Sequence, residues 1–303
     1  MIYSKFSQIT EKVKNAGEVK RMAVAVANER HTLEAVMEAR KEGLIKPVLV
    51  GNKSEISAIL NGMGESFSDA DIYDESDGAK ACDLAVKLVR ENKADFLMKG
   101  IIDTSVLLKA VVNKETGLAK GGLMSLFTIF EVPSYHKLLT IVDGGMVPYP
   151  TLEQKKFIIE NTVDILLALG YEKPKVAALA CIEKVNPKMP ETVEADELAQ
   201  MCKRDEMKNC IIEGPVSYDC AISKEIADIK GYVSQVSGDV DIMLAPNIHA
   251  GNIMAKALTC SCGAKLAGIV VGAKCPIVLT SRGSSSEEKL LSIMLSAAVN
   301  NRD

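Results

Sequence analysis

LLTIVDGGMVPYPTLEQKKFIIENTVDILLALG, residues 138–170, joins three patterns within one segment. Residues 138–144 form a short apolar run with β-branched side chains, which is typical of a buried strand. A loop rich in glycine and proline follows over 143–151, and residues 151–170 then have the composition of an amphipathic helix. A buried strand followed by a loop and an amphipathic helix is the unit from which α/β proteins are built.

The same alternation runs through the rest of the chain. Short apolar runs predict further strands at 22–27, 47–51, 94–100, 175–181, 210–215, 240–246, 266–272 and 276–282. Longer stretches between them predict helices that include 31–43, 79–93 and 249–261. Strands that are apolar throughout are buried on both faces, so the sequence predicts an α/β protein with a largely parallel sheet covered by helices on both sides.

Several predicted strands end in a small or polar cluster just before the next helix. These clusters are MKGIIDTS (98–105), VDGGMVPYPT (142–151), EGPVSYD (213–219), APNIHAGN (245–252) and TSRGSSS (280–286). In open α/β sheets, ligands bind at the carboxyl ends of the strands. The five loops are therefore candidates to converge on one ligand-binding cleft.

The loop 143–151 is also the best candidate for a domain boundary, although a simple connection has the same composition. The predicted division places residues 1–143 with 274–303 in a first α/β domain and residues 144–273 in a second.

The composition is that of a globular protein with a substantial core. The 303 residues are 48% hydrophobic, and the formal charge of −4 comes from 40 acidic and 36 basic residues mixed along the chain, so no broad positive field favours nucleic acid. The N-terminus has no apolar signal core and no run is long enough to span a bilayer, which predicts a cytoplasmic protein without a membrane partner. The eight cysteines are predicted to be free thiols, and the three histidines lack metal-binding spacing.

The segment IVLTSRGSSSEEKLLSI, residues 277–293, has the densest cluster of hydroxyl groups in the chain. Arg282 offers a planar fork of donors, the serines offer hydroxyls, and the start of the following helix offers free backbone N–H groups, a combination that suits an anion. The alternative is that Ser284 or Ser285 simply caps the helix, with Glu287 or Glu288 favoured in its first turn by the helix dipole.

A second candidate anion site lies at the end of the strand predicted over 94–100. Lys99 and Gly100 end this strand, and the hydroxyls of Thr104 and Ser105 precede the next helix, an arrangement that suits phosphate. The alternative is an exposed lysine followed by a capping threonine.

Asn252 and Lys256 are four residues apart, so they share one face of a helix that is predicted to begin near Ala250. That face is either a binding surface or an ordinary solvated one. The sequence contains no GxxxxGK[ST], GxGxxG or GxSxG motif, which argues against P-loop kinases, nicotinamide-binding proteins and the usual serine hydrolases.

Seven segments, taken in order, resemble the phosphate acetyl/butyryltransferase family, and within it the butyryltransferase branch. They are MKGIIDTSVLLKAV, GLMSLFTIFEVPSY, LTIVDGGMVPYPTLEQKKFIIENTVDILLALG, VAALACIEKVNPKMPETVEA, EGPVSYDCAIS, APNIHAGNIMAKAL and VVGAKCPIVLTSRGSSSEEKLLSI. The resemblance covers the chain from Met22 to the C-terminus. It implies a fold like that of the isocitrate and isopropylmalate dehydrogenases, with two α/β domains, mostly parallel sheets and an interdomain cleft, and an assembly that is a homodimer or larger.

The resemblance implies reversible transfer of a short-chain acyl group, with butyryl favoured, between coenzyme A and inorganic phosphate to give an acyl phosphate, without a metal or redox cofactor. Ser281 would stabilise the thiolate or the developing oxyanion, and Arg282 would hold phosphate. Glu288, seven residues after Ser281, would be the base for the coenzyme A thiol. The related acetyltransferases carry aspartate at that position, so Glu287 is an alternative base.

The resemblance also implies substrate-binding positions in several of the matching segments. These are Lys99, Gly100, Thr104, Ser105, Ser125, Asp143, Asp219, Asn252, Lys256, Gly283 and Ser284.

Three other functions are weighed against this one. A phosphate acetyltransferase acting on acetyl-CoA is the nearest alternative. A metal-dependent decarboxylating dehydrogenase of the same fold needs an aspartate cluster, and the sequence offers isolated candidates in Asp143, Asp219 and Asp241. A non-catalytic phosphate- or nucleotide-binding protein is disfavoured because Lys99 and the Ser281-Arg282 pair are intact.

Overall fold

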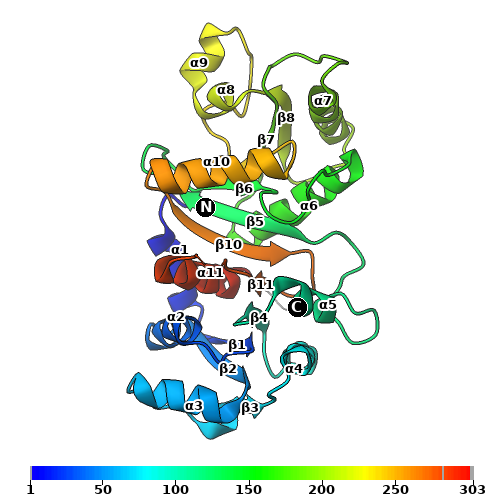
Figure 1. The fold of residues 1–303 in the computed structure, drawn as a ribbon. Helices are drawn as coiled ribbons and strands as arrows, with labels where there is room; N and C mark the ends of the chain where they lie inside the picture. The colour runs from blue at the N-terminus through cyan, green and yellow to red at the C-terminus, as the bar shows by residue number, and fades with distance from the viewer. Residues whose placement is uncertain (1, 282, 301–303) are drawn as a thin grey trace. The chain divides into compact units, whose positions relative to one another are not determined.

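The computed structural model describes residues 2–281 and 283–300, and the chain packs as two compact units (Figure 1). The terminal unit comprises Ser7–Gly122 and Ala267–Asp303, and the central unit comprises Met1–Phe6 and Leu123–Leu266. The domain boundaries predicted at residues 143/144 and 273/274 stay a prediction. In both divisions the C-terminal segment returns to the part formed by the first third of the chain.

The terminal unit is built on a mostly parallel sheet whose strands hydrogen-bond in the order β3-β2-β1-β4-β11-β10. Strand β10 runs antiparallel to β11, and the other neighbours in this order are parallel. Its elements are α1 (Phe6–Asn15), β1 (Lys20–Ala25), α2 (Arg30–Lys41), β2 (Ile45–Gly51), α3 (Lys53–Gly62), the 3₁₀ helix η1 (Asp69–Asp71), β3 (Ile72–Asp74), α4 (Gly78–Arg90), β4 (Phe96–Lys99), α5 (Thr104–Val111), β10 (Lys265–Val271), β11 (Ile277–Val278) and α11 (Ser286–Val299).

Helices cover both faces of this sheet. Helices α2 and α11 pack together against one face, and α4 packs with α5 against the other, as Figure 1 shows on either side of β1 and β2. The central strands carry the continuous apolar runs that this arrangement requires, since residues 22–25 and 96–98 are fully buried.

The central unit repeats the same construction with strand order β5-β6-β9-β7-β8, in which β5 is antiparallel to β6 and the other neighbours are parallel. Helices α6 and α7 pack on one face, while residues of α8, α9 and α10 join the apolar core on the other. The elements are β5 (Ser125–Glu131), β6 (Leu139–Val142), α6 (Leu152–Leu169), β7 (Lys175–Leu179), α7 (Pro190–Lys203), β8 (Ile211–Val216), α8 (Tyr218–Ile222), α9 (Lys224–Ile229), β9 (Ile242–Leu244) and α10 (Ile248–Ser261).

The α/β architecture predicted from the alternation of strands and helices is confirmed. Each predicted strand is present, although the polar clusters at the strand ends shorten several of them. Among the described residues of the run 276–282, only Ile277 and Val278 form a strand, β11. The prediction missed β3 and β5. Within the described residues, every helix is too short or too polar to cross a membrane.

Candidate functional site

A pocket of about 830 Å³ opens at the carboxyl ends of β1, β4 and β11 in the terminal unit. We call it the serine pocket. Its wall is formed by three segments at the ends of these strands and by Lys289 of α11. The three segments are Glu29, His31 and Thr32, residues 99–103, and the described residues of 280–286. Two of the five polar clusters singled out in the sequence, 98–105 and 280–286, therefore meet at one site.

Gly100 allows the loop after β4 to lie directly against the end of β1. Its N–H donates to Ala25 O at 2.8 Å, and the N–H of Ile101 donates to Val26 O at 2.9 Å. A Cβ at Gly100 would lie 2.1 Å from Val26 O, a distance that no side chain tolerates. Close packing against the end of β1 thus requires glycine at position 100, independently of any role in substrate binding.

Lys99 is held at the edge of the serine pocket by its own loop. Its Nζ donates to Gly100 O at 3.2 Å and to Ile102 O at 2.9 Å, so the side chain is half-buried and ordered rather than simply exposed. Thr104 and Ser105 are the first two residues of α5, and the N-cap position belongs to Asp103. The alternative interpretation of Thr104 as the helix cap is wrong.

The serine cluster caps α11 and also reaches Glu288. Ser285 is the N-cap, and its Oγ accepts from the N–H of Glu288 at 3.1 Å. Ser284 Oγ donates to Glu288 Oε1 at 2.6 Å, and it lies 3.1 Å from Ser281 Oγ and accepts from the N–H of Ser281 at the same distance. The hydroxyls of Ser281 and Ser284 therefore form a hydrogen-bonded chain that ends on the carboxylate of Glu288. The N-cap of α11 is supplied by Ser285 alone.

Other predicted residues of this segment differ in how they are placed. Glu287 is exposed, while Glu288 is half-buried. Gly283 is under no steric demand, since a Cβ there would meet no described atom closer than Ser281 Oγ at 4.0 Å. Arg282, predicted to hold phosphate, lies outside the described residues.

Lys289 is a pocket residue that the sequence prediction missed. It follows Glu288 in α11, its side chain lines the serine pocket, and it is 9% exposed. The available signal was its spacing of four residues from Ser285, which places both residues on one face of the helix. Across the pocket, Glu29 caps α2 by accepting from the N–H of Thr32 at 2.9 Å; burial alone would raise the pKa of Glu29, but the hydrogen bonds from Thr32 and the charge of Lys289 bring it below its ordinary value.

In the central unit, Asp143 is buried in a ring of backbone donors. Its carboxylate accepts from the N–H groups of Leu126 at 2.9 Å, Gly145 at 2.7 Å and Met146 at 2.8 Å. Burial raises the pKa of Asp143, and these hydrogen bonds oppose that rise. The carboxylate of Asp143, which was predicted to bind substrate, therefore connects the start of β5 to the loop after β6 through hydrogen bonds.

The structure brings Asn252 to the same loop. Its Nδ2 donates to Gly144 O at 3.1 Å, and Gly144 and Gly251 pack so closely that a Cβ on either would approach the backbone of the other. Lys256 is exposed one turn further along α10. Ser125 is fully buried at the start of β5, and its hydroxyl has no hydrogen-bond partner among the described residues.

Asp219 belongs to a polar cluster after β8 with Glu183, Ser217, Cys220 and Lys230. Ser217 Oγ lies 2.5 Å from Asp219 Oδ1, and Lys230 Nζ lies 2.9 Å from Asp219 and 3.0 Å from Glu183. The hydrogen bonds from Ser217 and Lys230 lower the pKa of Asp219 to about 2. Glu183, Asp219 and Cys220 approach one another closely enough to hold a metal ion, but the ammonium of Lys230 already forms ion pairs with both carboxylates.

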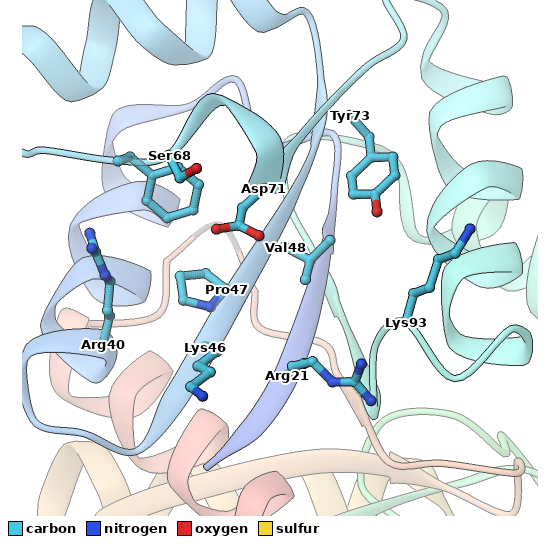
Figure 2. Close-up of a pocket in the computed structure, with 10 residues that line it drawn as sticks. Arg21, Arg40, Lys46, Pro47, Val48, Ser68, Asp71, Tyr73 and Lys93 are labelled. Atoms are coloured by element: carbon cyan, nitrogen blue, oxygen red, sulfur yellow. The ribbon is translucent and has the colours of Figure 1, made fainter.

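Two further cavities lie elsewhere in the two units. A cavity of about 430 Å³ in the central unit has a mainly apolar wall that includes Leu179, Met189, Tyr218 and Met254. A cavity of about 520 Å³ in the terminal unit lies near the amino ends of β1 and β2, where Figure 2 shows basic side chains around Asp71. Its Arg21 is paired with Asp95 and its Lys93 with Glu91, and it contains no residue predicted to be functional.

Comparisons with known proteins show one family. A family model described as "Phosphate acetyl/butaryl transferase" matches residues 77–297. A phosphate butyryltransferase from Clostridium acetobutylicum is 43% identical over 294 residues, which are 97% of this chain and 97% of the relative. A phosphate acetyltransferase from Thermotoga maritima is also 43% identical, over 281 residues that cover 93% of this chain and 95% of the relative.

Solved structures give the same result for the fold. A branched-chain phosphotransacylase from Enterococcus faecalis matches with a TM-score of 0.82 and 30% identity, over 94% of this chain and 100% of that one. A 4-hydroxythreonine-4-phosphate dehydrogenase from Burkholderia phymatum matches over 95% of this chain and 100% of that one with a TM-score of 0.58, and at 13% identity it shows the fold alone. The predicted dehydrogenase-like fold class is confirmed. Because the family model spans most of the chain and relatives at 43% identity cover nearly all of it, the chain belongs to the phosphate acetyl/butyryl transferase family.

Proposed function

We propose that this protein catalyses the reversible transfer of a short-chain acyl group between coenzyme A and inorganic phosphate, giving an acyl phosphate and free coenzyme A. Butyryl-CoA is the favoured substrate, and acetyl-CoA is the alternative. Both kinds of relative support this reaction class. The observation that carries the proposal is the hydroxyl chain from Ser281 through Ser284 to Glu288 at the carboxyl end of the sheet, in a pocket that also contains Lys99.

The chemistry requires a base for the coenzyme A thiol and donors for two developing negative charges. A free thiol has a pKa of about 8.5, so a positioned carboxylate increases the fraction of thiolate available near neutral pH. The thiolate attacks the carbonyl carbon of the acyl phosphate, the carbonyl oxygen becomes an oxyanion, and collapse of the adduct expels phosphate. In the opposite direction, phosphate attacks the acyl-CoA and expels the thiolate.

We assign the base to Glu288 rather than Glu287. Ser284 donates to the Glu288 carboxylate at 2.6 Å and so orients it toward the serine cluster, whereas Glu287 is exposed. In this proposal Ser281 stabilises the thiolate or the oxyanion and Arg282 holds phosphate. Hydrogen-bond donors that are already in place before the reaction often make the largest single contribution to stabilising the transition state of acyl transfer.

The other predicted substrate-binding positions divide into three groups. Lys99, Ser284 and Gly283 line the serine pocket, and we propose that they contact substrate. Gly100, Asp143 and Asn252 are engaged by backbone groups, and we propose that they act by holding their loops in place. Thr104, Ser105, Ser125, Asp219 and Lys256 remain proposed binding residues.

The proposed reaction needs no metal or redox cofactor, since the thiolate is generated by a carboxylate and the charges are met by protein donors. A homodimeric or larger assembly and a cytoplasmic location remain predictions.

The reaction is tested directly by ³¹P NMR. Enzyme treated with a chelator is mixed with butyryl-CoA and inorganic phosphate, and the spectrum is followed for the resonance of an acyl phosphate. The proposal predicts that this resonance grows as free thiol appears in equal amount. Thiol release without acyl phosphate would indicate a hydrolase, and the absence of both would reject acyl transfer.

A further inference from the structure

Lys289 combines a buried side chain with an ammonium that forms no direct hydrogen bond or ion pair with the described residues. It is 9% exposed, and within the described part of the chain its ammonium has neither a hydrogen bond nor an ion pair. Removing an ammonium from water without a partner costs several kcal/mol in general, so a buried lysine is ordinarily paired. The buried lysines Lys137 and Lys155 of the central unit follow that rule, since each forms an ion pair with a carboxylate.

The carboxylates of Glu29 and Glu288 accept hydrogen bonds from other residues rather than from Lys289. Glu29, whose pKa reflects the charge of Lys289, accepts from both the N–H and the Oγ1 of Thr32. Glu288 accepts from Ser284 through its carboxylate. The other lysine of the serine pocket, Lys99, is tied to two carbonyl oxygens.

The groups around Lys289 suit an anion with several acceptor oxygens. The wall of the pocket includes the hydroxyls of Ser281, Ser284 and Ser286, and α11, a helix of 14 residues, begins beside them. The first N–H groups of a helix and nearby hydroxyls favour a tetrahedral oxyanion, and an unpaired ammonium adds the charge.

We propose that Lys289 binds a phosphoryl group of the substrate in the serine pocket. This inference rests on the proposed function and adds a binding residue to it. The phosphoryl group is either that of inorganic phosphate and the acyl phosphate, or one carried by coenzyme A. The buried ammonium is then paired only when substrate is bound, so its charge contributes to binding.

The first test measures binding without turnover. Inorganic phosphate is titrated against wild type and Lys289→Met, in which an apolar chain of similar length replaces the ammonium, and the rise in melting temperature gives an apparent dissociation constant. Loss of a hydrogen bond to a charged group predicts a weakening of roughly tenfold or more. Lys289→Arg should recover most of the affinity. The control is Lys87→Met, which removes an exposed lysine of α4 in the same unit and should bind as wild type does.

The second test separates the two sources of the phosphoryl group. Steady-state constants are measured for phosphate, for butyryl-CoA and for butyryl-pantetheine, which lacks the phosphates of coenzyme A. A higher KM for phosphate in Lys289→Met assigns the lysine to inorganic phosphate. A higher KM for butyryl-CoA, with butyryl-pantetheine unchanged, assigns it to coenzyme A.

The proposal is overturned if Lys289→Met changes none of these constants, whatever its melting temperature, because the ammonium then makes no contribution to substrate binding. If the methionine variant does not fold, Lys289→Gln is measured in its place under the same criteria. The wild-type protein could bind phosphate through Lys289 and yet show no acyl transfer. That result would support this inference and reject the proposed reaction.

Discussion

Ser284 and Ser285 are adjacent in sequence but have different partners. Ser285 binds the backbone N–H of Glu288, which is the ordinary task of a helix cap, and Ser284 binds the carboxylate of the same residue. Capping is thus the task of Ser285, while the hydroxyl of Ser284 is free of that task and is the one to which we assign a part in the proposed chemistry. This distinction depends on which rotamer each serine adopts, which residue type and spacing do not determine.

The assignment of the base is tested by replacing each glutamate separately. Glu288→Gln should lower kcat by roughly 10²–10⁴, the usual contribution of a general base, and should change the KM values less. Glu287→Gln is the matched control and should stay close to wild type. Phosphate-dependent thiol release from butyryl-CoA measures both, and a larger loss in Glu287→Gln would move the base to that residue.

Asp143 should behave as a structural residue. Asp143→Asn replaces one carboxylate oxygen by an amide that cannot accept from the surrounding N–H groups, so we expect a loss of about 1–3 kcal/mol in the free energy of unfolding in urea. Asp164→Asn, which changes an exposed aspartate of α6, should have almost no effect. Equal stability in the two variants would show that the backbone hydrogen bonds of Asp143 contribute little.

At the level of elements, the two strand-end loops of the serine pocket differ in how tightly they are packed. Gly100→Ala would force a methyl group against Val26 O and Ala25 O, so we expect at least the 1–3 kcal/mol loss that is typical of overpacking, together with distortion of the pocket. Gly283→Ala places its methyl group in open space and should change the free energy of unfolding by less than about 0.5 kcal/mol. Urea denaturation checks both, and equal losses would contradict the described packing.

The amino ends of β6, β7 and β9 are joined by a charged cluster that should make stability depend on pH. Lys137, 2% exposed, pairs with Asp239 at 2.7 Å and Asp241 at 2.6 Å, and Lys175 also pairs with Asp239. Burial alone would raise the pKa of Asp239, but hydrogen bonds from Lys137, Lys175 and His136 hold it well below its ordinary value of 3.8. The stabilisation is therefore present above that value and is lost as the pH falls below it.

Asp239→Asn tests this dependence. The variant should be less stable than wild type near neutral pH, and the difference should shrink as the pH is lowered below 3.8. Urea unfolding at several pH values provides the measurement. A difference that stays constant with pH would mean that the Asp239 carboxylate is not the titrating group.

The strands that the sequence predicted and those that it missed differ in pattern. Runs such as residues 22–27 are buried on both faces and therefore continuously apolar, which makes them recognisable without any partner. Strand β5, SLFTIFE, includes polar residues at its buried positions, and β3 has only three residues. The hydrogen bond from Leu126 to Asp143 joins residues 17 apart, and the burial of Lys289 depends on packing between α2 and α11, so neither is visible in local spacing.

For the whole molecule, overall similarity identifies the family more clearly than the substrate. A phosphate butyryltransferase and a phosphate acetyltransferase are equally identical to this chain, at 43%. One methylene group in an apolar pocket changes binding by only about 1–3 kcal/mol, so a few side chains are enough to change the preferred acyl chain. The choice between butyryl and acetyl therefore depends on the shape of the acyl site.

The most direct test of the proposed function is the rate of thiol release from acetyl-, propionyl-, butyryl- and valeryl-CoA, each with and without phosphate and without added metal. We predict release that requires phosphate and is fastest with butyryl-CoA. Phosphate-dependent release that is fastest with acetyl-CoA would contradict the butyryl preference while keeping the reaction class. The absence of phosphate-dependent release from all four would contradict acyl transfer itself.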